Sequence, residues 1–307
     1  MRVWSVSSSK LKTFMECPAL YYWRYVAKKP EKSASVKLLG NGAPAEIVSS
    51  GSTDTRIEQE PSTIFDSGKL VHRVLELAAQ KRITNASCDK KATKKELLGL
   101  LESVASEPPT DDWQRPLIIS PETIESAAKV LALCWKSISF PYTIATEKKF
   151  DVSIGPVEDD KGNVVIEDAR LNGVIDRIDK LPNRHTKIVD YKSGWSVMSR
   201  AEAELDPQIN FYLVVGKLLF PKDDIDMELR YLNRGIRLGP IHYTEARKDW
   251  LINGYVKPIL ARMVTWSVYP ENPGSPQCYS CPRKSECASF ASMVKGTLGP
   301  VGADMGQ

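Results

Sequence analysis

The chain has 307 residues and a net charge of +4, with 42% hydrophobic and 26% charged residues. This composition is typical of a globular protein that is long enough to bury a core. No apolar run approaches the ~20 residues of a membrane helix, and the amino terminus lacks the apolar core of a secretory signal. These features exclude the membrane-spanning and secreted classes, so we expect an intracellular, cytoplasmic protein (host cytoplasm if the source is viral). The mild positive charge permits nucleic-acid binding without requiring it.

The first segment predicts two short helices followed by a loop. A serine at Ser7 to Ser9 suits the start of the first helix, and Pro18 suits the first turn of the second. Cys17 lies between them and, taken alone, is typical of a small buried side chain. Residues 27–62 are rich in Ser, Gly, Ala, Pro and Lys and show no period. This composition predicts a mobile loop or insertion more than an ordered lid.

A strong helix begins at Phe65. Leu70, Val74 and Leu77 recur at helical spacing, which predicts a face that packs against the core. His72 lies beside that face. A lone histidine in such a position is usually structural, so its role depends on the rest of the chain.

The next segments predict helices and then strands. Residues 88–138 indicate a helical insertion, because apolar residues recur at helical spacing between prolines. Thr143–Ile154 and Asn163–Glu167 are predicted strands. Glu147 lies among polar neighbours on the first of these strands, where a surface glutamate and a functional one fit equally well.

The stretch Leu171–Gly194 is the centre of the sequence. Two β-branched runs flank the polar residues Pro182–Arg184, which predicts a hairpin with a short loop. Asp176 lies in the first strand, and Asp190 and Lys192 share one side of the second, because strand side chains alternate faces. Charged groups in apolar strands are costly unless something binds them. Two carboxylates and a lysine at a hairpin form a good site for a hard divalent cation and a phosphate.

A helix from about Leu205 follows the hairpin. Gln208 and Tyr212 are four residues apart and share one face of this helix. An amide and a phenol on such a face can hydrogen-bond a DNA backbone or orient a lysine. Met227–Asn233 and Leu238–Tyr243 are predicted as the remaining strands.

The last predicted element before the carboxyl-terminal segment is a long helix that starts at Thr244 or Glu245 and reaches about Trp266. Trp250, Tyr255 and Trp266 recur along it at helical intervals. This spacing favours packing in the core over stacking on bases.

The carboxyl-terminal segment contains clustered thiols. Cys278, Cys281 and Cys287 have the spacing Cys-x2-Cys-x5-Cys. In a reducing compartment such a cluster indicates metal binding more than disulfides. Three thiols are incomplete for a tetrahedral zinc site or an iron-sulphur cubane, and Cys17 is the best candidate for the fourth ligand. The spacing alone accepts either zinc or iron-sulphur.

Together, these motifs resemble the PD-(D/E)XK nuclease superfamily and, in detail, its RecB-like branch. Asp176 and the triplet Asp190–Lys192 correspond to the acid and the (D/E)-x-K of that family. The helix Gly68–Glu76 reads Gly-x-x-x-His-x-x-Leu-Glu, and Gln208 and Tyr212 match Gln-x-x-x-Tyr. The resemblance implies an α/β, restriction-endonuclease-like fold with a mixed central sheet flanked by helices.

The resemblance also implies roles for single residues. The implied ligands of Mg²⁺ or Mn²⁺ are His72, Asp176, Asp190 and the backbone carbonyl of Tyr191. Lys192 would orient or deprotonate the attacking water, and Gln208 and Tyr212 would hold the lysine or the DNA backbone. Glu147 stands where the family often carries a glutamate that supports the metal site.

Cys17 combined with the carboxyl-terminal cysteines resembles the iron-sulphur staple of RecB-like nucleases, including the AddB type and the CRISPR-associated exonucleases. This resemblance implies a 4Fe-4S cluster that joins residues 1–26 to residues 270–292. Zinc remains the alternative occupant. Cys88 and Cys134 have no partnering pattern and are interpreted as structural.

The expected protein is a single nuclease domain over residues 1–307. Its expected activity is that of a metal-dependent DNA nuclease, an exonuclease that hydrolyses phosphodiester bonds in recombination, repair or DNA processing. The expected substrate is DNA that is single-stranded or has free ends. The alternative is a non-cleaving or partner-dependent DNA-binding subunit of a recombination or CRISPR-adaptation complex.

Overall fold

A computed structural model describes residues 3–27, 63–85, 87, 89–106, 119–274, 278–279 and 281–294. The chain divides into two compact units, unit 1 with residues 1–12 and 61–266 and unit 2 with residues 13–60 and 267–307. Apart from Ala27, the loop predicted at 27–62 lies outside the described residues, and so does Cys88. Within the described part of the chain, no helix combines the length and the apolar character that crossing a membrane requires.

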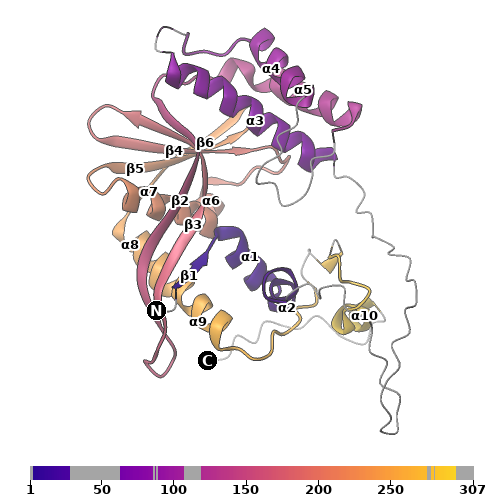
Figure 1. The fold of residues 1–307 in the computed structure, drawn as a ribbon, viewed down its shortest axis with the longest axis vertical. Coiled ribbons are helices and arrows are strands. Elements are labelled where there is room, and N and C mark those ends of the chain that lie inside the picture. Colours follow the sequence, from indigo (N-terminus) through magenta and orange to yellow (C-terminus); the bar gives the residue numbers. More distant parts are fainter. Residues whose placement is uncertain are drawn as a thin grey trace, which may run out of the picture. The chain divides into compact units, whose positions relative to one another are not determined.

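Unit 1 is built on a mixed sheet of six strands (Figure 1). The strands are β1 (Val3–Val6), β2 (Thr143–Glu158), β3 (Val164–Leu181), β4 (His185–Lys192), β5 (Asp224–Tyr231) and β6 (Ile236–His242). The long strand β3 pairs antiparallel with β2 and β4 and parallel with β1. Strand β5 pairs parallel with β4 and antiparallel with β6. The predicted α/β fold with a mixed central sheet is therefore confirmed.

The predicted hairpin corresponds to β3 and β4. Its loop contains Asn183 and Arg184, which have φ angles of 60° and 57°. Two consecutive positive φ angles are typical of the tight turn that matches the twist of paired strands. The two strands predicted at Asn163–Glu167 and from Leu171 form one continuous strand, β3.

Some helices of unit 1 pack against this sheet, and others pack on those helices. These helices are α3 (Thr63–Thr84), α4 (Lys94–Ser106), α5 (Pro121–Cys134), η2 (Trp135–Ser137), α6 (Arg200–Leu205), α7 (Pro207–Leu219), α8 (Glu245–Asp249), η3 (Trp250–Val256) and α9 (Lys257–Thr265). Helices α4 and α5 lie beside α3 (Figure 1). The predicted helical insertion is thus a layer that contains α4 and α5 and packs on α3.

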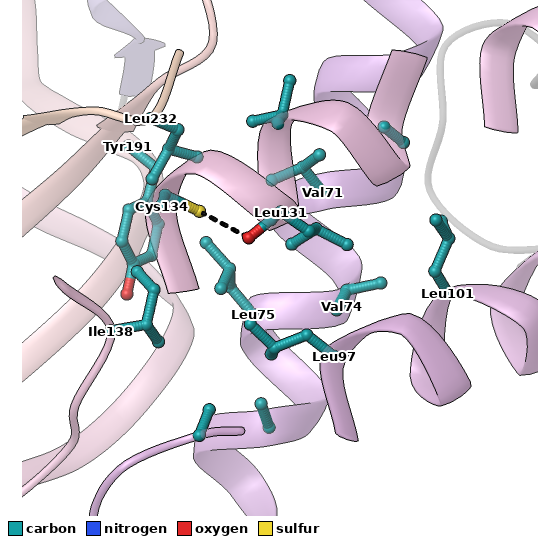
Figure 2. Close-up of a cluster of buried hydrophobic side chains, with 14 of the residues drawn as sticks. Val71, Val74, Leu75, Leu97, Leu101, Leu131, Cys134, Ile138, Tyr191 and Leu232 are labelled. Atoms are coloured by element: carbon teal, nitrogen blue, oxygen red, sulfur yellow. Dashed lines mark hydrogen bonds between the residues drawn. The ribbon is translucent and has the colours of Figure 1, made fainter. Parts of the chain in front are cut away.

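A dry core joins α3 to the insertion and the sheet (Figure 2). Val71, Val74 and Leu75 of α3 are at most 1% exposed, and they belong to the same buried cluster as Leu131 of α5 and Tyr191 of β4. Burying such side chains contributes ~1.5–3 kcal/mol each. This packing fixes the position of α3 on the sheet, and with it the position of His72.

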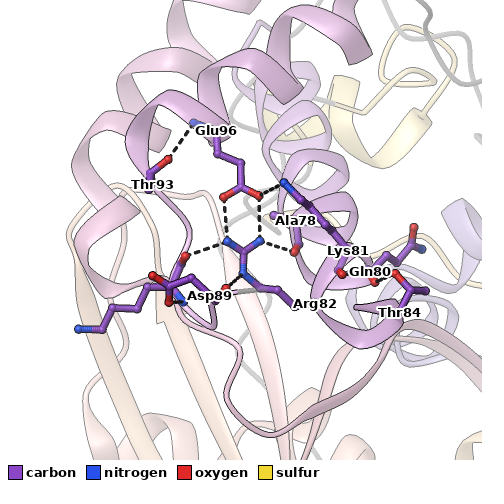
Figure 3. A network of polar contacts seen from close by, with 9 residues as sticks. Ala78, Gln80, Lys81, Arg82, Thr84, Asp89, Thr93 and Glu96 are labelled. Atoms are coloured by element: carbon purple, nitrogen blue, oxygen red, sulfur yellow. Dashed lines mark hydrogen bonds and ion pairs between the residues drawn. The ribbon is translucent and has the colours of Figure 1, made fainter. Parts of the chain in front are cut away.

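A buried ion pair ties the end of α3 to α4 (Figure 3). The Arg82 side chain is 2% exposed, and its Nη2 and Nη1 atoms lie 2.8 Å and 3.0 Å from the Glu96 carboxylate. The same guanidinium donates to the backbone oxygens of Ala78, Asp89 and Lys91. All of its donors therefore have partners, which is the condition under which a buried charge is tolerated.

The long helix predicted up to Trp266 is interrupted. It consists of α8, the π-helical segment η3 and α9, and Pro258 stands in the first turn of α9, where it lacks an N–H to donate. The prediction that Trp250 packs in the core is wrong. Its side chain is 42% exposed and stacks on Tyr255 at a centroid distance of 5.8 Å.

Unit 2 brings the two ends of the chain together. Helix α1 (Ser8–Glu16) crosses the boundary between the units, and α2 (Pro18–Tyr21), η1 (Tyr22–Val26) and α10 (Ala288–Val294) lie within unit 2. Phe14 packs edge-on against Tyr21 and Tyr269. The Ala19 N–H donates to the Pro270 oxygen at 3.1 Å. Aromatic packing and backbone hydrogen bonds therefore join segments that are far apart in the sequence.

Candidate functional site

The acidic residues of the hairpin lie where β3 and β4 separate. The ladder between these strands ends at the pair Arg177–Val189. Asp176 and Asp190 are the next residues beyond that pair, one on each strand. The backbone N–H of Tyr191 is released from that ladder, and it donates instead to Asp176 Oδ2 at 2.8 Å. The end of the ladder thus frees a backbone donor that orients one of the two acids.

Three side chains from different elements converge at this point. His72 of α3, Glu147 of β2 and Asp176 of β3 each place one ligand atom within 4.8 Å of the others. His72 Nδ1 lies 3.7 Å from Asp176 Oδ2. Ligands around one octahedral ion at ~2.1 Å are separated by ~3–4 Å. The donor set of one imidazole and two carboxylates therefore fits Mn²⁺ or Mg²⁺ after a small contraction.

Glu147 is held in an unusual environment. The register of β2 and β3 sets it opposite Asp176, and its φ angle is 45°, in the left-handed region. Burial raises the pKa of Glu147 to about 8, and the carboxylates of Asp176 and Glu76 add to this, while Arg73 opposes it. Strained backbone and crowded carboxylates are typical of functional sites. The sequence left this residue undecided, and the strand pairing brings it to Asp176.

Asp190 lies beside Lys192 rather than within this group of three. Its Oδ2 is 2.9 Å from Lys192 Nζ. Burial and the Asp176 carboxylate raise the pKa of Asp190 to about 6, and Lys192 works against that rise. Burial alone would lower the pKa of Lys192, but Asp190 and Asp176 outweigh it and raise that pKa. The lysine is therefore a charged ammonium at neutral pH.

The two predicted residues of α7 have different contacts. Gln208 Oε1 accepts a hydrogen bond from Lys192 Nζ at 3.2 Å, so the amide orients the lysine. The Tyr212 phenol donates to the backbone oxygen of Val174 at 3.1 Å. That contact ties α7 to β3 two residues before Asp176, which makes Tyr212 a support for the acid.

A close approach between α3 and the end of β4 explains the glycine of the histidine motif. A Cβ atom at Gly68 would lie 2.5 Å from Ser193 Oγ and 3.2 Å from Ser193 Cβ. Gly68 is one helical turn from His72, and Ser193 directly follows Lys192. The glycine therefore permits the close approach of α3, which carries His72, to the end of β4, which carries Lys192. Sequence reasoning missed Ser193, because the contact depends on the packing of α3 on the sheet.

Comparison with known families agrees with this geometry. The family described as the PD-(D/E)XK nuclease superfamily matches residues 5–288. The chain belongs to the PD-(D/E)XK nuclease superfamily. A stretch of 104 residues is also 34% identical to one subunit of the ATP-dependent helicase/deoxyribonuclease of Lactococcus lactis subsp. cremoris (strain SK11). That match covers 33% of this chain and 9% of the relative.

In this member of the nuclease superfamily, the four predicted cysteines line one small pocket of unit 2. They are Cys17, Cys278, Cys281 and Cys287, accompanied by Leu20 and Phe290 among others. Cys17 Sγ and Cys287 Sγ each accept a backbone N–H at 3.4 Å, from Leu20 and Phe290 respectively. Among the described residues, no three cysteine sulphurs lie within 4.8 Å of one another. Cys134 is buried in the core of unit 1, as predicted for a structural cysteine.

Proposed function

We propose that the chain is a divalent-metal-dependent deoxyribonuclease that digests DNA from free ends. The observation that carries the proposal is the convergence of His72, Glu147 and Asp176 next to the Asp190–Lys192 pair. Membership of a nuclease superfamily supports hydrolysis of a phosphodiester backbone. The name of the bacterial relative, a deoxyribonuclease subunit, supports DNA as the substrate.

The protein groups have separable tasks in this proposal. His72, Glu147 and Asp176, with Asp190 and the Tyr191 carbonyl, would hold the cation. A bound Mg²⁺ or Mn²⁺ would supply Lewis-acid activation of water and neutralise charge on the scissile phosphate.

The Lys192 ammonium, charged at neutral pH, donates to a phosphate oxygen or positions the water. Gln208 holds the lysine in that orientation.

A digestion assay on the purified chain tests the proposal. With Mn²⁺ or Mg²⁺, we expect loss of linear single-stranded DNA and resistance of a circular strand of equal sequence. Asp190→Ala and Lys192→Ala should lose at least ~100-fold in rate, since each removes a group that acts on the reacting phosphate. Lys161→Ala, at the exposed turn between β2 and β3, is the matched control and should retain full rate. Full activity in either site variant, with thermal melts unchanged, would overturn the assignment.

We further propose that the four cysteines hold a 4Fe-4S cluster, with zinc as the alternative. A tetrahedral zinc site brings its thiolates to ~3.8 Å from one another, since each Zn–S bond is ~2.3 Å. In a cubane, each thiolate binds a different iron, so the sulphurs are spread more widely. All four cysteines line one pocket, which supports a shared metal group there, and such a group would cross-link the two ends of unit 2.

The absorbance spectrum of anaerobically purified protein tests the cluster. A broad band near ~400 nm with four bound irons is expected, and a colourless zinc-loaded protein would contradict it. Cys17→Ala and Cys281→Ala should lose the band and lower the melting temperature of the protein. Cys134→Ala, at a thiol outside the pocket, should retain the band. A variant that lost the metal but kept normal thermal stability would refute the stabilising role.

A second candidate function follows from the relative. The matched protein is one subunit of a helicase/deoxyribonuclease, which favours a chain that binds DNA but cuts only with a partner. Under this candidate, the purified chain binds single-stranded DNA with Mn²⁺ present and leaves it intact. Cleavage by the chain alone excludes this candidate.

A further inference from the structure

The loop that follows the catalytic lysine carries an exposed tryptophan. Trp195 is three residues after Lys192, and its side chain is 57% exposed. Leaving a large apolar ring in water is unfavourable, because apolar surface is stabilised by burial. The Trp195 ring is exposed enough to be available for contact with a ligand.

The loop around Trp195 is anchored to the end of β5. The Leu232 N–H donates to the Lys192 oxygen at 2.9 Å, and the Asn233 side chain donates to the Ser193 oxygen. On the other side of the tryptophan, the Met198 N–H donates to the Tyr231 hydroxyl at 3.1 Å. The indole is therefore presented by a segment fixed at both ends, and it is not at the tip of a free loop.

A guanidinium group lies over the same ring. Arg234 Cζ is 5.2 Å from the centroid of the Trp195 ring. Within the part of the chain that the structure describes, no carboxylate neutralises this exposed arginine. An aromatic face beside an unneutralised guanidinium is the combination that binds bases by stacking and phosphates by charge.

The distance along the chain between Lys192 and Trp195 limits which nucleotide Trp195 and Arg234 can contact. Three residues span at most ~11 Å, so the Trp195 backbone stays within that distance of Lys192. This spacing allows a strand whose phosphate is held by Lys192, as proposed, to place a neighbouring base on the indole. Stacking on this ring requires a base that is released from its own duplex.

We propose that Trp195 and Arg234 form a platform that stacks on an unpaired base beside the scissile phosphate. Trp195 supplies the stacking surface, and Arg234 pairs with the adjacent phosphate. The inference rests on the proposed nuclease function and adds to it the residues that select a single-stranded end at the site.

Binding of oligonucleotides with one abasic position tests the platform. The Asp190→Asn background prevents cleavage, and the fluorescence anisotropy of dye-labelled single-stranded DNA gives the affinity. One abasic position should weaken binding by about 5- to 150-fold, the range known for base–aromatic stacking. The Trp195→Ala variant should bind the intact strand more weakly than the parent does, by the same factor. In that variant, the strand with the abasic position should bind as tightly as the intact strand. Trp195→Phe should stay within ~3-fold of the parent, because it keeps a stacking ring.

Trp250→Ala is the matched control, since it removes an exposed indole that stacks on Tyr255 instead of an arginine. It should leave the abasic pattern unchanged. The platform is overturned if Trp195→Ala binds the intact strand as tightly as its parent, or keeps the same abasic penalties. It is also overturned if Trp195→Ala weakens a blunt duplex as much as a single strand.

The outcome for the platform is separable from that for the nuclease, because the binding cycle involves no cleavage. A wild-type chain that cuts no DNA but shows the Trp195-dependent pattern refutes the nuclease and keeps the platform. If the wild-type chain cleaves DNA but the abasic pattern does not depend on Trp195, the nuclease is kept and the platform is refuted.

Discussion

Gly68→Ala is a direct test of how the site is assembled. The added Cβ would lie 2.5 Å from Ser193 Oγ, so the Ser193 side chain must rotate, or α3 and the Lys192–Gly194 segment must separate by roughly 1 Å, to reach an ordinary contact distance. The change to alanine contributes ~1 kcal/mol in helix propensity, whereas overpacking costs ~1–3 kcal/mol. We expect a net loss of up to ~2 kcal/mol in the free energy of unfolding.

The effect on activity should be larger than the effect on stability. A displacement of ~1 Å between catalytic elements can cost ~100-fold in rate, and here it separates His72 from Lys192. Urea unfolding and initial rates of DNA digestion measure the two effects. Gly99→Ala is the matched control, since a Cβ on this exposed glycine of α4 meets nothing within 4 Å. It should stabilise the protein by ~0.5–1 kcal/mol and leave the rate unchanged.

The double variant Gly68→Ala with Ser193→Ala identifies the cause. Removing the hydroxyl leaves only the 3.2 Å contact to Cβ, which a small shift relieves. We expect recovery of most of the lost stability and rate, which is non-additive behaviour typical of residues in contact. If Gly68→Ala stabilises the chain as Gly99→Ala does and retains full activity, the reasoning is refuted.

Three further predictions concern the support of the fold. Glu96→Gln should destabilise at pH 7 by ~1–3 kcal/mol, because Arg82 is buried. Hydrogen bonds from Arg82 outweigh the effect of burial and hold the pKa of Glu96 below its usual range. The ionised Glu96 carboxylate therefore stabilises the folded protein above the unfolded pKa of ~4.3, and this stabilisation is lost as the pH falls through the lower folded pKa. Equal stability of variant and parent at pH 7 would contradict it. Arg177→Met should cost ~3–5 kcal/mol by leaving the buried Asp179 carboxylate unpaired, and chemical denaturation of Arg177→Met with Asp179→Asn should show partial recovery. Leu75→Ala should cost ~2–5 kcal/mol in the same assay, since the side chain is 1% exposed, and a loss under ~1 kcal/mol would show that the core refills the cavity.

Several features of the protein follow from the sequence alone. The β-branched runs around Pro182–Arg184 predict the hairpin, because local turn chemistry and strand alternation are properties of neighbouring residues. The same alternation sets Asp190 and Lys192 on one side, where their charged atoms lie 2.9 Å apart. The ordered motifs also predicted the superfamily, which the match over residues 5–288 confirms. Such signals are local, so they can be read without the fold.

The tertiary structure decided what depends on pairing between distant segments. Glu147 comes close to His72 and Asp176 only because β2 pairs with β3. The strand Val3–Val6 was not predicted, since four residues carry little periodic signal and their partner lies on β3. Trp250 was placed in the core by its spacing, but its ring is 42% exposed and stacks on Tyr255. Spacing along a chain gives the period of one element, whereas the contacts between elements decide which side chains meet.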